Sequence, residues 1–114
     1  MDHNITQNVL SDDTIVINPG SVLDNNNAHH MVDIISRAQS MGYHFIMIDM
    51  SQLQFISSAG VGSILGAVET SRENGGDIVL CNVSESVLHI LRVLDLTDFL
   101  TIRDDIDHAV ETRG

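Results

Sequence analysis

Two adjacent serines, Ser57 and Ser58, are the residues of this chain whose type and placement could carry chemistry. They follow the largely apolar segment 53–56 and precede residues whose apolar side chains recur at helical spacing, so they stand where a helix begins. Serine is a favoured N-cap because its hydroxyl satisfies an otherwise unpaired backbone N–H, and one serine suffices for that role. The second hydroxyl would face the positive end of the helix dipole, a setting that favours a phosphate group. Capping alone and phosphate chemistry are therefore both open.

Other catalytic and nucleotide-binding motifs fail on spacing or composition. Gly60, Gly62 and Gly66 approach a dinucleotide-binding G-x-G-x-x-G, but its third glycine would have to replace Leu65. A P-loop needs a lysine, which the chain lacks, and a hydrolase G-x-S-x-G needs glycine in place of Ile56. No general base or metal pair stands beside the serines, so we expect a binding protein without a small-molecule substrate rather than an enzyme.

Metal and thiol chemistry also find little support. His29 and His30 precede Asp33 in a predicted helix, and His29 and Asp33 share one of its faces, but two ligands leave a tetrahedral zinc site incomplete. Four other histidines are scattered without ligand spacing: His3, His44, His89 and His108. Cys81, the only cysteine, lies in the apolar segment 78–81, where a buried and inert thiol is expected. We expect no metal, no cofactor and no disulfide.

Composition limits the class of protein and its partners. A chain of 114 residues, 43% hydrophobic and 18% charged, predicts one globular domain over residues 1–114. Sixteen carboxylates against five arginines give a net charge of -11, which opposes binding to nucleic acid or to an anionic membrane surface. No apolar run approaches the roughly 20 residues of a spanning helix, and residues 1–8 lack the features of a secretory signal. We expect a cytoplasmic protein.

The elements that must position the serines follow from periodicity and turn residues. Helices alternate with strands after an opening hairpin, in the order β-β-α-β-α-β-α-β-α, which predicts an α/β fold with a mixed β-sheet flanked by helices. The predicted strands cover residues 5–10, 14–17, 45–48, 78–81 and 100–102, and the helices cover residues 25–41, 57–73, 84–94 and a short segment from 104. The apolar strand 45–48 is placed near the sheet centre and 100–102 at an edge.

Helical spacing also predicts which side chains face the core. The expected core positions are Ala28, Met31, Val32, Ile35 and Ala38, then Val61, Ile64, Leu65 and Val68, then Val87, Leu88, Leu91 and Leu94. Gly62 and Gly66 lie one turn apart and predict a smooth ridge for close contact with the sheet or with a partner. Sites in α/β sheets lie beyond the carboxyl ends of strands, and we place the candidate site at the Ser57 and Ser58 turn.

Several segments of the chain resemble those of a known family. Residues 55–62, Phe-Ile-Ser-Ser-Ala-Gly-Val-Gly, resemble the phosphoacceptor motif of the STAS domain, as found in bacterial anti-sigma factor antagonists. Residues 20–24 resemble the glycine-to-aspartate segment before the first helix of the family, and residues 48–51 the end of its central strand. Residues 82–99 resemble its third-helix region. The similarity spans about the whole chain and implies a STAS-like fold.

The family motif usually reads Asp-Ser-[Ser/Thr]-Gly, so the resemblance places the phosphoacceptor at Ser58. Ser57 stands in the place of the family aspartate and remains a second candidate, while Ala59 replaces a hydroxyl residue. The resemblance also implies that Asp24 and Asp49 lie near the acceptor and shape a docking surface, with capping of a helix or strand end as the alternative. The remaining residues of the implied partner-binding surface are Ser57, Ala59, Gly60 and Gly62.

The function that the resemblance implies is partner switching. The unphosphorylated antagonist binds an anti-sigma factor serine kinase and frees the sigma factor, phosphorylation ends the complex, and a PP2C-type phosphatase restores it. STAS domains also serve other assemblies: anion transporters, which the lack of a membrane segment disfavours, stress-sensing complexes and lipid-transport accessory subunits. A small hydrolase or phosphotransfer enzyme is a further alternative and would need a base beside Ser58.

Overall fold

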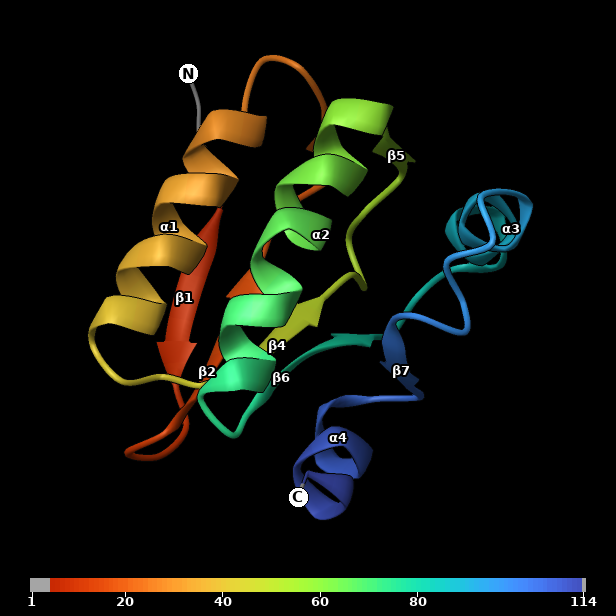
Figure 1. Ribbon diagram of the computed structural model, residues 1–114. Coiled ribbons are helices and arrows are strands. Elements are labelled where there is room, and N and C mark those ends of the chain that lie inside the picture. Colours follow the sequence, from red (N-terminus) through yellow and green to blue (C-terminus); the bar gives the residue numbers. More distant parts are fainter. Residues whose placement is uncertain (1–4, 114) are drawn as a thin grey trace.

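Five strands form the main sheet of the computed structural model, which describes residues 5–113 (Figure 1). Their spatial order is β1-β2-β4-β6-β7; β1 runs antiparallel to β2, and the other neighbours are parallel. The bounds are β1 (Thr6–Val9), β2 (Thr14–Asn18), β4 (Phe45–Asp49), β6 (Asp77–Cys81) and β7 (Thr101–Arg103). The predicted α/β fold with a mixed sheet is confirmed, with β4 in the middle and β7 at an edge.

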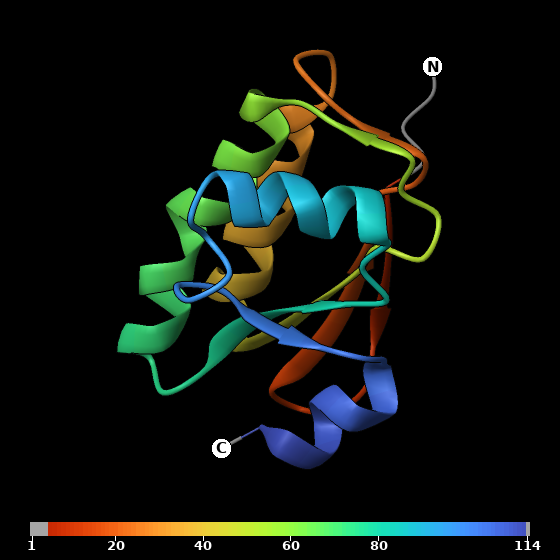
Figure 2. The ribbon, with the colours of Figure 1, turned by 90° about the vertical axis from the view of Figure 1, so that its right-hand side faces the viewer.

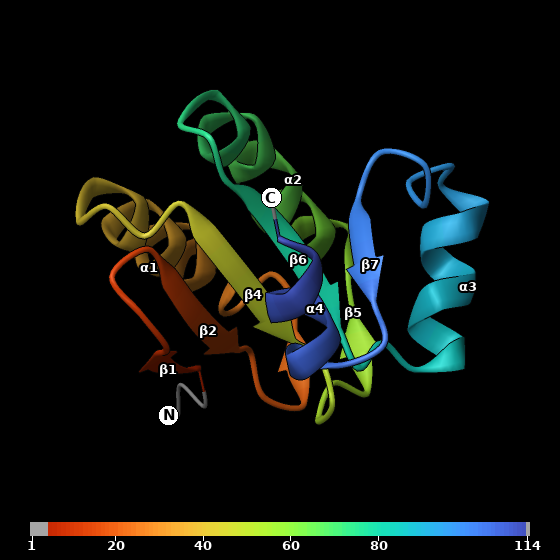
Figure 3. The same cartoon turned by 90° about the horizontal axis from the view of Figure 1, so that it is seen from below.

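Helices cover both faces of this sheet. The four helices of the described residues are α1 (Ala28–Ser40), α2 (Ser58–Glu73), α3 (Glu85–Val93) and α4 (Ile106–Thr112). Seen from below, α1 and α2 lie side by side on one face and α4 lies on the other (Figure 3). In β4, Ile46 and Ile48 pack into the core with the first three helices, whereas Met47 packs with Ala109 of α4. This alternation explains why the strand is apolar at every position.

Two short strands form a second ladder that the sequence analysis did not predict. Strand β3 (Val22–Leu23) pairs in parallel with β5 (Phe55–Ile56). Each strand has only two residues, too few for a period-2 pattern, and their pairing joins segments more than thirty residues apart in sequence. Ser57 therefore follows a strand of this ladder. The sequence analysis instead placed the turn at the carboxyl end of a strand of the main sheet.

Helix starts follow the capping residues closely. Ser57 and Ser84 are the N-caps of α2 and α3, and each side chain accepts a hydrogen bond from the backbone three residues ahead. Helix α1 begins at Ala28, three residues later than predicted. The cause is a turn in which the Asp24 N–H donates to Asn27 Oδ1 (2.9 Å) and the Ala28 N–H donates to the Asp24 carbonyl oxygen (2.9 Å).

Two of the predicted core positions are wrong. Val32 is 48% exposed because α1 buries the stripe formed by Met31, Ile35 and Ala38, and Leu94 is 49% exposed because α3 has already ended at Val93. Of the two contacts predicted for the Gly62 and Gly66 ridge, the one with the sheet is excluded because both glycines face the surface, and the one with a partner stays a prediction. No helix within residues 5–113 has the length and apolar character needed to cross a membrane.

Candidate functional site

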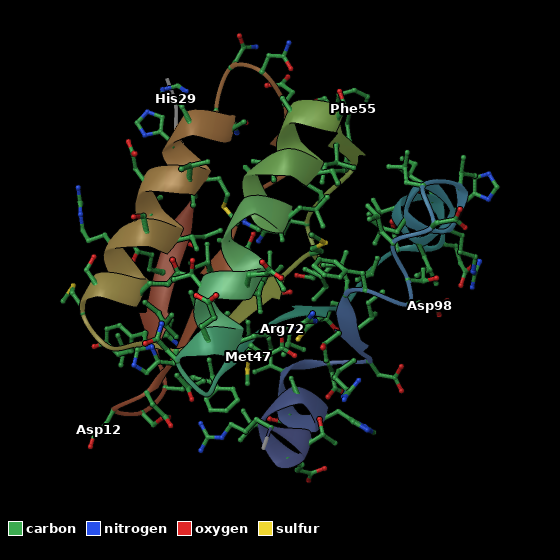
Figure 4. All side chains as sticks on the ribbon, in the orientation of Figure 1. Asp12, His29, Met47, Phe55, Arg72 and Asp98 are labelled. Atoms are coloured by element: carbon green, nitrogen blue, oxygen red, sulfur yellow. The ribbon has the colours of Figure 1, made fainter. Side chains whose placement is uncertain are left out.

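The candidate site is the corner where β5 turns into α2. The β3–β5 ladder holds this corner, and the Ser57 N–H extends the ladder by donating to the carbonyl oxygen of Leu23 (2.9 Å). Phe55 of β5 lies beside the start of α2, while Arg72 marks the opposite end of the helix (Figure 4). The loop between β3 and α1 therefore lies directly beside the start of α2.

Ser57 uses its hydroxyl twice. Its Oγ accepts a hydrogen bond from the Gly60 N–H (3.2 Å), which caps α2. The same hydroxyl donates to Oδ1 of Asn25 in the loop before α1 (3.4 Å). An aspartate at this position could make the first contact but, when ionised, could not donate the second. Asn25 was missed by the sequence analysis, because its neighbours are also asparagines and only the fold brings it to Ser57.

Ser58 is in a different setting. It is the first residue of α2, its side chain is exposed, and its hydroxyl makes no hydrogen bond to any part of residues 5–113. Backbone N–H groups of the first helical turn lack partners within the helix, and the helix dipole is positive there. A negatively charged group on this oxygen would be stabilised by both features.

The glycines of the motif have different roles. A Cβ on Gly60 would lie 2.5 Å from the Leu23 carbonyl oxygen and 2.9 Å from Ile56 Cγ1, so only glycine lets α2 pack this closely on the ladder. A Cβ on Gly62 would meet no atom within 4 Å. Ala59 and Gly62 are exposed, whereas Gly60 is buried. Gly60 therefore positions the helix, and Ala59 and Gly62 form its surface.

The two aspartates make contacts typical of turns and strand ends. Asp24 Oδ1 accepts from the Asn26 N–H (2.9 Å), within the turn that starts α1. Asp49 Oδ1 accepts from Asn82 Nδ2 (3.0 Å) and from the Ser51 N–H (3.1 Å). Partial burial acts to raise the pKa of Asp49, but these hydrogen bonds outweigh it and hold the pKa below its ordinary value. Within the described residues, neither carboxylate is hydrogen-bonded to a serine of the motif.

An apolar groove of about 390 Å³ lies between the start of α2 and α3, and we call it the α2–α3 groove. Its lining residues are Ile56, Ser57, Ser58, Val61, His89, Ile90, Val93 and Leu94. Figure 2 shows α3 crossing beside the first half of α2. The groove could not be predicted from the expected core, in which Leu94 was buried, whereas its side chain is exposed. The available signal was the density of apolar residues in this segment, at positions 87, 88, 90, 91, 93 and 94, which exceeds the roughly three to four per two turns of a core-facing stripe.

The histidines and the cysteine considered for metal or thiol chemistry do not form a site of that kind in the described residues. Among residues 5–113, no three His, Cys, Asp or Glu side chains gather as a metal site requires, and His3 lies outside the described residues. Cys81 is buried at the end of β6. Burial raises the pKa of its thiol to about 11, and the charges of Asp49 and Asp105 act in the same direction. This thiol is protonated at neutral pH.

Comparisons with known proteins agree with this architecture. The family model of the STAS domain matches residues 6–109. An anti-sigma F factor antagonist of Paenibacillus polymyxa is 28% identical over 87 residues, covering 72% of this chain and 74% of the relative. The crystal structure of a Thermotoga maritima protein, named as a candidate anti-sigma factor antagonist, has a TM-score of 0.86 at 25% identity and covers 96% of this chain and 93% of its own.

A second solved protein shares the fold at lower identity. The anti-sigma factor antagonist SpoIIAA in its unphosphorylated form has a TM-score of 0.74 at 22% identity, with 94% of each chain covered. SpoIIAA from Bacillus is also known in a phosphorylated form, with a TM-score of 0.73 at 21% identity and 94% and 96% coverage. With the family model matching 104 consecutive residues, from 6 to 109, this chain belongs to the STAS domain family.

Proposed function

We propose that this chain is an anti-sigma factor antagonist that acts in the cytoplasm by partner switching. Its unphosphorylated form binds an anti-sigma factor serine kinase and so frees the sigma factor. The kinase transfers the γ-phosphoryl group of ATP to the Ser58 oxygen, ADP leaves, and the hydroxyl proton passes to a base of the kinase. Phosphorylation ends binding, and a PP2C-type phosphatase restores the hydroxyl by hydrolysis.

The observation that carries this proposal is the difference between the two hydroxyls. Ser57 caps α2 and donates to Asn25, whereas Ser58 is exposed and makes no hydrogen bond within the described residues. A kinase could therefore modify Ser58 without breaking the hydrogen bond by which Ser57 caps α2. The relatives named as anti-sigma factor antagonists support the same role.

Phosphorylation would act through charge and hydration. It adds about -1.5 to -2 charges and a strongly hydrated group at the surface that the partner must cover. The chain already carries a net charge of -11, so its own arginines are too few to neutralise the added phosphate. The antagonist supplies only the acceptor hydroxyl, and the catalytic base and metal belong to the kinase.

The proposed partner-binding surface surrounds Ser58. Ala59 and Gly62 are its exposed members on α2, and Gly60 fixes the position of the helix. Asp24 orders the loop before α1 by accepting from the Asn26 N–H. Asn25, in the same loop, accepts the hydrogen bond from the Ser57 hydroxyl. Asp49 would act indirectly, because its hydrogen bond with Asn82 orders the segment that leads into α3.

Phosphate transfer with purified proteins tests the proposal. Affinity capture from the native cell on Ser58→Ala, followed by mass spectrometry, identifies the anti-sigma factor kinase, which is then purified. We expect this kinase and ATP to label the wild type and Ser57→Ala but not Ser58→Ala. Ser84→Ala is the matched control, because it removes the cap of α3 as Ser57→Ala removes the cap of α2.

Retention of the kinase is the second readout. In the presence of ATP, Ser58→Ala should keep the kinase bound while the wild type releases it, and Ser58→Asp should bind more weakly than the wild type, because an unpaired carboxylate is costly to desolvate. Labelling that persists in Ser58→Ala and disappears in Ser57→Ala would move the switch to Ser57. Labelling of no variant by a kinase shown to be active would overturn the proposal.

A further inference from the structure

We propose that the α2–α3 groove seats one or two large apolar side chains of the anti-sigma factor partner. This inference rests on the proposed function and adds to it a second contact, formed by α3 together with the start of α2. The groove volume of about 390 Å³ is near the lower limit of the roughly 300–1,000 Å³ of ligand pockets. It therefore suits a few side chains rather than a whole helix.

The lining of the groove leaves apolar surface in contact with water. Val93 is 68% exposed and Leu94 is 49% exposed, and Ile90 lies beside them on α3. Ile56 and Val61 supply the opposite wall. Covering these groups would stabilise a complex by about 25 cal/mol for each Å² of apolar surface buried. The groove thus has the apolar centre that binding hot spots require.

The groove adjoins the acceptor Ser58, and this position indicates that its occupant is the kinase. Ser57 and Ser58 belong to the wall of the groove. Phosphoryl transfer requires the kinase to hold ATP in line with the Ser58 oxygen, so the kinase surface must close over this wall. A partner that reaches Ser58 from the side of α3 covers the groove in the same step.

The charge distribution agrees with an apolar contact there. The chain has sixteen carboxylates, yet none of the eight lining residues is acidic, and His89 is the one ionisable side chain among them. A phosphate on Ser58 would place a hydrated dianion at the edge of this otherwise uncharged surface. Apolar partner groups would then have to desolvate that dianion, so phosphorylation would oppose binding in the groove as well as at Ser58.

Val93→Glu and Met41→Glu are the matched test. Val93 ends α3 and Met41 is the C-cap of α1, their exposed fractions are 68% and 67%, and both substitutions add one carboxylate near a helix C-terminus. Binding of the purified anti-sigma factor kinase is measured by calorimetry for both variants and for Val93→Gln, which removes the apolar group without adding charge. Circular dichroism and thermal unfolding check that each variant is folded.

We expect Val93→Glu to raise the Kd about tenfold or more, Val93→Gln to raise it by a smaller factor, and Met41→Glu to leave it within about twofold. In the phosphorylation assay, Val93→Glu should raise KM and leave kcat unchanged, because it affects docking and not the acceptor. Equal affinity of the wild type, Val93→Glu and Met41→Glu would overturn the groove and leave the proposed function intact. If no kinase binds the wild type, the proposed function fails and the groove proposal fails with it.

Discussion

Ser57 and Ser58 are adjacent residues of the same type in different chemical environments. Their placement at a helix start could be predicted, because serine before an apolar helical pattern is an N-cap signal. Which serine caps the helix could not be decided until Ser57 was found to accept from Gly60 and donate to Asn25. The second contact joins residues 32 positions apart, and no local pattern encodes such a pair.

Gly60 gives the sharpest prediction at the residue scale. Gly60→Ala would bring its Cβ within 2.5 Å of the Leu23 carbonyl oxygen, so we expect the free energy of unfolding to fall by about 1–3 kcal/mol. Gly66→Ala is the control, because its Cβ meets nothing within 4 Å and alanine favours the helix by about 1 kcal/mol. Urea unfolding measures both, and a Gly60→Ala variant as stable as the wild type would contradict the close packing.

The elements differ in how far the sequence defines them. Helices α2 and α3 were predicted close to their observed bounds, as were the opening hairpin, the central strand β4 and the edge strand β7, because helical periodicity and continuous apolar runs carry strong signals. The β3–β5 ladder was missed because two-residue strands have no period, and it is this ladder that fixes the corner before Ser58. Leu94 was misplaced because the apolar pattern continues one residue beyond the end of α3.

Helix α2 presents its exposed face to a second groove, lined by Gly62, Ser63, Gly66, Ala67 and Thr70 and by Val32, Ser36 and Gln39 of α1. If the kinase contacts α2 here, Gly62→Gln should weaken kinase binding about tenfold, because its long side chain projects from an open position. Gly62→Ala is the control, because it reduces the freedom of the backbone in the same way but adds a side chain too short to obstruct the kinase. Calorimetry with the kinase and urea unfolding decide the case. Unchanged affinity and stability in Gly62→Gln would remove Gly62 from the binding surface.

The whole molecule combines a doubly covered sheet with an unbalanced charge. The core against α1, α2 and α3 was predicted in outline. The packing of α4 against Met47, Val79 and Cys81 was not, because a short helix with three apolar residues does not show which face of the sheet it covers. Among the described residues, Arg72 pairs with Asp77 (2.9 Å) and joins the end of α2 to β6, and Arg113 pairs with Asp13 (3.3 Å) and joins the end of α4 to the turn between β1 and β2. Against these attractions stand sixteen carboxylates and a net charge of -11.

Because repulsion among the carboxylates is greater in the compact state than in the unfolded chain, salt should stabilise this protein. Surface ion pairs contribute only about 0–1 kcal/mol each, so their screening should not reverse the effect. We expect Tm at pH 7 to rise by roughly 2–5 °C between about 0.02 M and 0.3 M NaCl and then to level off as the Debye length falls below about 6 Å. The control is the same titration at pH 4.5, near the sequence pI of about 4.5, where the net charge vanishes and the salt dependence should disappear. A Tm that falls with salt at pH 7 would mean that the attractions of Arg72 and Arg113 outweigh the repulsion among the carboxylates.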